Sequence, residues 1–243
     1  MITELDKLTP DSTESAFINC DCMEAMKRFP DNYFDLAIVD PPYGIGVGHK
    51  LNRGGRAITY GESKKALAKQ KEYHMFDDST TPDEEYFKEL FRVSKAQIIW
   101  GGNFFLDYLG NASCLIVWDK GRRNMDQADC EIAWTSLKGQ SRVFNYMWNG
   151  MLQENMKNKE RRIHITQKPV VLYKWCIDKF AKEGDVILDT HVGSASSLIA
   201  CYKMNHRFIG FEKDGYYYKE ALDRLNDEMA QMTIFDMIGE SKR

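Results

Sequence analysis

The sequence has no run of apolar residues that approaches the length needed to cross a bilayer, so it predicts no membrane-spanning helix. Its six cysteines show no Cys-x-x-Cys spacing and its five histidines are scattered, which predicts free thiols and neither disulfides nor a bound metal. Residues 1–14 are polar and acidic, unlike a signal or transit peptide. Together these absences favour a cytoplasmic protein.

An overall excess of basic charge is also missing, because the formal net charge is −3 at pH 7. By itself this argues against a nucleic-acid-binding protein. Basic side chains are nevertheless concentrated between residues 49 and 71, where Glu62 is the single acid. Such a run is often only a solvated face, but it can also contact phosphates. Both interpretations stay open for the candidate phosphate contacts Lys50, Arg53, Arg56, Lys64 and Lys65.

Candidate strands and helices alternate along the chain, which predicts an α/β fold with a mostly parallel sheet covered on both faces. The predicted strands are residues 17–20, 34–39, 96–100, 114–118, 131–134, 186–188 and 208–211. The predicted helices are residues 23–28, 83–93, 103–109, 170–181, 194–204 and 216–232. The length suits a single domain over residues 1–243. Residues 44–79 and 138–167 are polar and rich in glycine or asparagine, so we expect long functional loops or a small inserted subdomain there.

The predicted strand at residues 34–39 ends in Asp40, Pro41, Pro42 and Tyr43. The two prolines cannot continue the ladder of a sheet, and they fix the backbone of this edge. The edge therefore presents a carboxylate, bare carbonyl groups and a flat ring together. A planar amino group could donate two hydrogen bonds to it while its own ring stacks on Tyr43. The alternative is an ordinary turn at the end of a strand.

A second motif joins the predicted strand at residues 186–188 to a helix through the small residues that follow Asp189. Small residues let a ligand approach the backbone, and the free N–H groups of a helix N-terminus attract a carboxylate or phosphate. Glu212 ends the next strand, 19 residues after Gly193, where an acid can accept hydrogen bonds from ribose hydroxyls. This spacing predicts a site for a nucleoside cofactor, with a plain strand-to-helix turn as the alternative.

Together the two motifs resemble the S-adenosylmethionine-dependent DNA amino-methyltransferases, which methylate adenine N6 or cytosine N4. Residues 40–43 fit the catalytic (D/N/S)-P-P-(Y/F/W) tetrad of that family. Residues 189–196 are similar to its cofactor motif D-P-F-x-G-S-G-T and keep Asp189, Gly193 and Ser194. They depart from it at Thr190, His191 and Ala195. Ala195 replaces a glycine and adds a methyl group where the cofactor would back onto the chain.

Two further segments carry the resemblance. Residues 164–169 are similar to the family's H-P-T-Q-K-P segment, which implies that Lys168 lies beside the methionine part of the cofactor. Asp21 lies about one strand before the tetrad, where the family places an acid on the cofactor's adenine. Taken alone, Lys168 with Pro169 could mark a helix start, and Asp21 could cap a helix.

The order of the motifs resembles the beta group of these enzymes, in which the tetrad precedes the cofactor turn. This implies a Rossmann-like methyltransferase fold with a seven-stranded sheet in circularly permuted order. The strand before the cofactor turn would then lie beside the strand before the tetrad, and both loops would lie at a topological switch point. We expect variable target-recognition loops at residues 44–80 and 120–165, and a C-terminal tail over residues 231–243.

The resemblance implies transfer of a methyl group from S-adenosylmethionine to adenine N6 of double-stranded DNA, by direct attack of a flipped-out base. S-adenosylhomocysteine would be the second product, and no metal takes part. A bacterial or phage-encoded enzyme of a restriction–modification system, associated with the nucleoid, is expected. Asp40 as the first tetrad residue favours adenine. The alternatives are a cytosine N4 enzyme, an RNA or protein-glutamine methyltransferase, and a cofactor-impaired relative that only binds DNA.

The tail contains the peptide Gln231, Met232, Thr233, Ile234 and Phe235. It resembles the short peptides by which bacterial proteins dock on the replication sliding clamp, and an aliphatic–aromatic pair suits a hydrophobic groove. The alternative is the end of a helix that packs on its own core. A homodimer is a further open alternative.

Overall fold

The computed structural model describes residues 1–46, 74, 78–121, 123, 128–149 and 152–240, with the backbone alone for residue 149 and residues 232–240. The strands are β1 (Ala16–Asn19), β2 (Leu36–Val39), β3 (Gln97–Trp100), β4 (Leu115–Asp119), β5 (Cys130–Thr135), β6 (Arg142–Asn145), β7 (Trp148–Asn149), β8 (Leu152–Gln153), β9 (Val186–Asp189) and β10 (Arg207–Glu212). The helices are α1 (Cys22–Met26), α3 (Glu84–Val93), α4 (Val170–Phe180), α5 (Ser196–Lys203) and α6 (Gly215–Glu240), with 3-10 turns η1 (Leu5–Lys7) and η2 (Gly102–Phe104).

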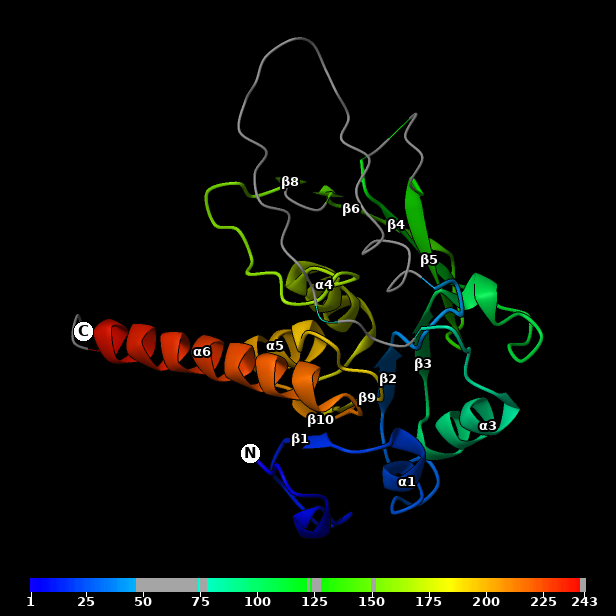
Figure 1. Cartoon of the computed structure of the whole chain (residues 1–243), viewed down its shortest axis with the longest axis horizontal. Coiled ribbons are helices and arrows are strands. Elements are labelled where there is room, and N and C mark those ends of the chain that lie inside the picture. The colour runs from blue at the N-terminus through cyan, green and yellow to red at the C-terminus, as the bar shows by residue number, and fades with distance from the viewer. Residues whose placement is uncertain (47–73, 75–77, 122, 124–127, 150–151, 241–243) are drawn as a thin grey trace.

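The main sheet has eight strands in the order β1-β10-β9-β2-β3-β5-β4-β6 (Figure 1). The strands from β1 to β3 in this order are parallel, and β5 runs antiparallel to both of its neighbours. Each of the seven predicted strands overlaps one of these eight. The additional strand is β6, which pairs with β4 inside a segment expected to be loop. The predicted mostly parallel α/β sheet is therefore confirmed, with one more strand at its edge.

The strand that precedes the tetrad and the strand that precedes the cofactor motif are neighbours. In the register of β2 with β9, Leu36 lies opposite Ile187 and Ala37 lies opposite Leu188. These residues are far apart in the sequence, so the pairing is the one expected for a circularly permuted order. The carboxyl ends of β1, β10, β9, β2 and β3 consequently meet at one edge of the sheet.

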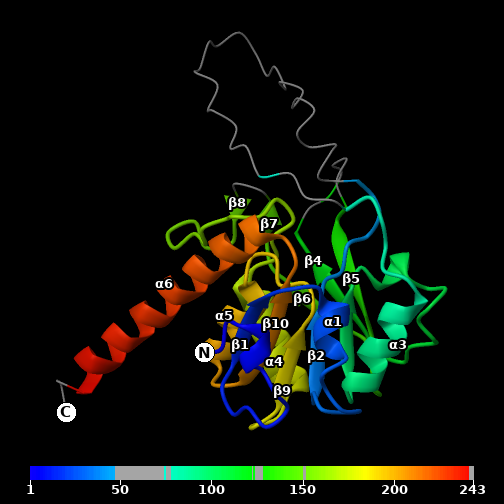
Figure 2. The same ribbon diagram turned by 60° about the horizontal axis from the view of Figure 1, so that its bottom comes forward.

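Helices cover both faces of the sheet. Leu36 and Ile38 of β2 belong to a buried cluster that includes α4 and α5, whereas Ala37 and Val39 belong to a second cluster that includes α1 and α3. This division follows from the alternation of side chains along a strand that is buried on both faces. α6 starts beside the sheet and extends well away from it, as Figure 2 shows.

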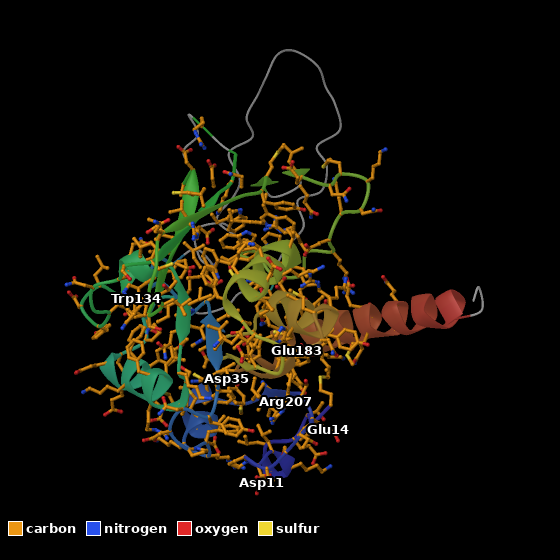
Figure 3. All side chains as sticks on the ribbon, turned by 180° about the vertical axis from the view of Figure 1, so that it is seen from behind. Asp11, Glu14, Asp35, Trp134, Glu183 and Arg207 are labelled. Carbon is orange, nitrogen blue, oxygen red and sulfur yellow. The ribbon has the colours of Figure 1, made fainter. Side chains whose placement is uncertain are left out.

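Polar side chains also interact at the opposite edge of the sheet, the amino edge, where the parallel strands begin. Asp35 precedes β2, accepts a hydrogen bond of 2.9 Å from the N–H of Val186 and pairs with Lys95 at 2.6 Å. Arg207 at the start of β10 donates to the carbonyl of Glu14 (Figure 3). These contacts fix the starts of the central strands, which leaves the loops at the other edge to form a site.

Two predicted helices differ from the structure. In place of a helix over residues 103–109 there is only the 3-10 turn η2, followed by a turn. Leu106 and Tyr108 are exposed there, so this short segment buries too little apolar surface to support a helix. α6 continues to Glu240, and its backbone includes residues 231–235. Among the described helices, none is both long and apolar enough to cross a membrane.

Candidate active site

Four of the predicted site acids lie at the carboxyl edge of four neighbouring strands. Asp40 follows β2, Asp189 ends β9, Glu212 ends β10 and Asp21 lies just after β1. Ligands of open α/β sheets bind outside the carboxyl ends of the strands. The fold therefore brings together residues that the sequence separates by as many as 191 positions, from Asp21 to Glu212.

Asp40 is held by two partners, one on each carboxylate oxygen. The hydroxyl of Tyr43 donates to Oδ1 at 2.5 Å, and the ammonium of Lys168 donates to Oδ2 at 2.5 Å. Lys168 also donates to the Tyr43 hydroxyl at 3.0 Å. Burial, and next the Asp40 carboxylate, raise the pKa of Tyr43 well above its usual value, so its hydroxyl stays protonated. Lys168 was expected beside the cofactor, and its ammonium lies at the tetrad.

Two residues of the loop after β3, Gly101 and Phe104, lie against the ring of Tyr43. A β-carbon on Gly101 would come within 2.2 Å of the ring, so only glycine fits there. Gly101 also has a φ of +68°, which glycine adopts without strain. The ring of Phe104 stacks on Tyr43 with 5.0 Å between centroids and an angle of 16°. Phe104 is 44% exposed, so this aromatic pair opens toward solvent.

Glu131 is a further acid of the site that the sequence did not single out. It lies on β5, with its Oε2 3.1 Å from the Lys168 ammonium and its Oε1 paired with Lys120. Burial raises the pKa of Glu131, but the two ammonium groups outweigh it and hold the pKa at about 2. Burial lowers the pKa of Lys168, and its two carboxylate partners reverse this and leave the pKa raised. The feature of the sequence that could have indicated Glu131 as a site residue is its position as an acid in a largely apolar strand.

The predicted cofactor turn has the geometry of a backbone cradle. Gly193 adopts a φ of +55°, and a β-carbon built on it meets nothing within 4 Å, so a ligand can approach the chain there. The carboxylate of Glu212 accepts hydrogen bonds of 2.8 Å from the N–H groups of Gly193 and Asp214. Asp189 accepts from the N–H of His191 at 2.9 Å and from the Ser197 hydroxyl. Burial raises the pKa of Asp189 to about 7.

In the turn after Gly193, Ala195 stands where the resembled cofactor motif has glycine, and its backbone conformation is one that favours glycine. Ala195 caps α5 with a φ of +61°, a left-handed conformation that alanine adopts at a cost. The preceding carbonyl, that of Ser194, accepts a 2.6 Å hydrogen bond from Arg224. Arg224 is buried and pairs with Glu160 at 2.9 Å, so α6 supports the turn from behind. No pattern in the sequence indicates this support.

Asp21 caps α1 and also contacts Lys213, the residue after Glu212. Its side chain accepts from the N–H of Met23 at 2.9 Å and pairs with Lys213 at 2.8 Å. The hydrogen bond with Lys213 is the main reason why the pKa of Asp21 is lowered. The candidate DNA contacts Lys50, Arg53, Arg56, Lys64 and Lys65 lie outside the described residues, as do the side chains of Met232, Thr233, Ile234 and Phe235.

Comparisons with known proteins agree with this geometry. The model of a family described as DNA methylase, N6_N4_Mtase, matches residues 119–223. The type II methyltransferase M2.DpnII of Streptococcus pneumoniae is 23% identical over 242 residues, which cover 87% of this chain and 89% of that protein. The chain is therefore similar to DNA amino-methyltransferases over most of its length.

Solved structures of DNA methyltransferases have the same fold as this chain. The crystal structure of the M1.HpyAVI–SAM complex superposes with a TM-score of 0.52 and 20% identity, over 86% of this chain and 98% of that one. The cytosine-N4-specific PvuII DNA methyltransferase superposes with a TM-score of 0.56 and 12% identity, over 88% of this chain and 86% of that one. The predicted Rossmann-like methyltransferase fold is confirmed.

Proposed function

We propose that this protein transfers a methyl group from S-adenosylmethionine to the N6 amine of adenine in double-stranded DNA. The observation that carries the proposal is the adjacency of the Asp40 edge to the cofactor turn, through the pairing of β2 with β9. The Asp40 edge, which would accept hydrogen bonds from the target amine, and the turn that would hold the nucleoside cofactor thus lie at one edge of the sheet. A direct transfer between two bound molecules requires such an arrangement.

The cofactor cradle fits a nucleoside with a small charged tail. Glu212 would accept hydrogen bonds from the ribose of the cofactor, and Asp21 would contact the adenine ring of the cofactor. The open backbone at Gly193, together with Ser194 and Asp189, would border the rest of the molecule. We place Lys168 at the end of the cofactor from which the methyl group leaves, because its ammonium lies at Asp40. When bound, S-adenosylmethionine supplies an electrophilic methyl group on a sulfonium.

The residues of the tetrad would prepare the amine. Its lone pair is delocalised into the base, so the nitrogen is a poor nucleophile. Asp40 and the carbonyl of Pro41 would accept its two hydrogens and favour a tetrahedral nitrogen that points its lone pair at the methyl group. The nitrogen would take this methyl group, and S-adenosylhomocysteine would remain as the second product. The amine then gives up one proton, which Asp40 can pass to water.

The target base must leave the duplex to reach this edge, and Tyr43 would then stack against it. The basic segment with Lys50, Arg53, Arg56, Lys64 and Lys65 would contact the DNA phosphates. Asp40 favours adenine by its likeness to the N6 enzymes. Cytosine N4 is the second candidate, and the likeness in fold to the PvuII enzyme keeps it open. Clamp docking through residues 231–235 and a homodimer stay predictions.

One experiment tests base, atom and site together. The protein is expressed in a bacterium without its own DNA methyltransferases, and the DNA is sequenced with detection of modified bases. We expect N6-methyladenine within one short sequence, and none with Asp40→Ala although that variant still binds the cofactor. Asp11→Ala, an exposed acid at the opposite edge (Figure 3), is the matched control and should modify DNA fully. Full modification by Asp40→Ala would contradict the proposal, and N4-methylcytosine would establish the second candidate.

A further inference from the structure

Four charged side chains from four segments form one continuous network at the tetrad. Lys168 lies between Asp40 at 2.5 Å and Glu131 at 3.1 Å, and Glu131 in turn pairs with Lys120. The side chain of Lys168 is only 3% exposed, and that of Lys120 is 14% exposed. Two anions balance two cations, as groups this far removed from water require.

Both oxygens of Asp40 already accept a hydrogen bond from a strong donor. One carboxylate oxygen accepts the Tyr43 hydroxyl and the other accepts the Lys168 ammonium. A target amine must donate a hydrogen bond to the same carboxylate. The Lys168 ammonium is itself a nitrogen with hydrogens directed at Asp40, so it stands where such a donor would stand. The base therefore competes with Lys168 for Asp40, and a shift of Lys168 would favour its entry.

We propose that Glu131 is a positioning residue for the transfer and acts through Lys168, by keeping the ammonium when the target amine takes Asp40. The inference rests on the proposed function, and it assigns a role to a residue outside the tetrad and the cofactor turn. Because Lys168 already lies within ion-pair distance of both carboxylates, it can give up Asp40 with a small movement and remain paired.

The surroundings of Glu131 suit this role. Lys120 holds the other carboxylate oxygen, and its ammonium in turn lies 4.8 Å from the centre of the Trp118 ring. The Glu131 carboxylate is thereby fixed in orientation toward Lys168. Without it, a Lys168 that left Asp40 would be a buried cation with no anion, which is strongly unfavourable. Lys168 would then stay on Asp40 and compete with the base.

The test replaces Glu131 by glutamine, which keeps the shape of the side chain and removes its charge. Methyl transfer is measured with labelled S-adenosylmethionine and unmethylated genomic DNA of mixed sequence. In Glu131→Gln we expect kcat to fall by about tenfold or more, while the affinities for DNA and for cofactor change by less than about twofold. Glu89→Gln is the matched control, because Glu89 pairs with Arg92 in a half-buried ion pair on α3, away from the site. It should keep the wild-type kcat.

A role through Lys168 predicts that the effects are not additive. In the background of Lys168→Met, Glu131→Gln should lower kcat by less than about twofold further, since the group it positions is gone. Glu131→Asp keeps the charge and should recover much of the lost rate. Equal losses in both backgrounds, or a folded Glu131→Asp as slow as Glu131→Gln, would overturn the inference.

A second readout separates this inference from the proposed function. The pKa of the Lys168 ammonium, followed by NMR with labelled lysine, should fall in Glu131→Gln because one of its two anions is lost. An unchanged pKa would overturn the inference whatever the activity. A wild-type protein that methylates no DNA would instead overturn the proposed function, while a shifted Lys168 pKa would still show that Glu131 acts on Lys168.

Discussion

Gly101 and the ring of Tyr43 are in direct contact, so closely that a β-carbon at position 101 would lie 2.2 Å from Cε1 and 2.5 Å from Cζ of the ring. Gly101 is on the loop after β3, and Tyr43 is in the tetrad after β2. The backbone of one strand end thus sets the position of the aromatic ring on the next.

Gly101→Ala should therefore displace Tyr43 and, with it, the hydroxyl that donates to Asp40. We expect methyl transfer to fall by about a hundredfold, since small misplacements in an active site cost that much. Cofactor affinity, measured by calorimetry, should change little because the cofactor turn is on other strands. Gly110→Ala is the control, since a β-carbon there meets nothing within 4 Å. A Gly101→Ala variant as active as the control would show that the ring position does not matter.

Ala195 provides a test of backbone strain. Ala195→Gly removes a fully buried methyl group but relieves a left-handed alanine, and these effects are both about 1 kcal/mol and opposite in sign. The free energy of unfolding, from urea titration, should therefore change by less than about 1 kcal/mol. Ala200→Gly is the matched control, because it also removes a fully buried methyl group but lies within α5. Ala200→Gly should lower the free energy of unfolding by about 2 kcal/mol. Equal losses in the two variants would contradict the strain.

Asp189 should make stability depend on pH. Burial raises its pKa in the folded protein to about 7, above the ordinary value of 3.8. Between these values the unfolded chain binds fewer protons than the folded one, so stability falls as pH rises from about 4 to about 7. The loss of unfolding free energy between pH 5 and pH 8 should be smaller in Asp189→Asn than in the wild type, by roughly 1–3 kcal/mol. Identical losses in the two proteins would show that Asp189 ionises normally.

The basic segment can be tested through salt. Replacing Lys64 and Lys65 by alanine should weaken binding to all DNA sequences alike. If both contact phosphates, the slope of log affinity against log salt should flatten by about 2. Lys179 and Lys182, exposed near the amino edge of the sheet, are the control pair and should leave the slope unchanged. An unchanged slope for Lys64 and Lys65 would remove them from the interface.

The sequence predicted the parts of the site that depend on strand ends. Asp40 and Glu212 each follow a short apolar run, and parallel strands necessarily bring their carboxyl ends together. Glu131 was not predicted as a site residue because its partner Lys168 comes from a distant loop. Only the fold shows that the two side chains meet. β6 was not predicted as a strand because it is an exposed edge strand. It lacks the alternation of buried and exposed side chains that is typical of a half-buried strand.

The pairing of β2 with β9 has a consequence for how the chain folds as it is synthesised. The N–H of Val186 and the carboxylate of Asp35, which join the starts of these strands, are 151 residues apart. Until the later strand emerges from the ribosome, β2 presents an unpaired edge, and such edges invite pairing with other chains. A nascent chain truncated before residue 186 should therefore aggregate, so this order of strands makes production of the protein dependent on rapid completion of its C-terminal third.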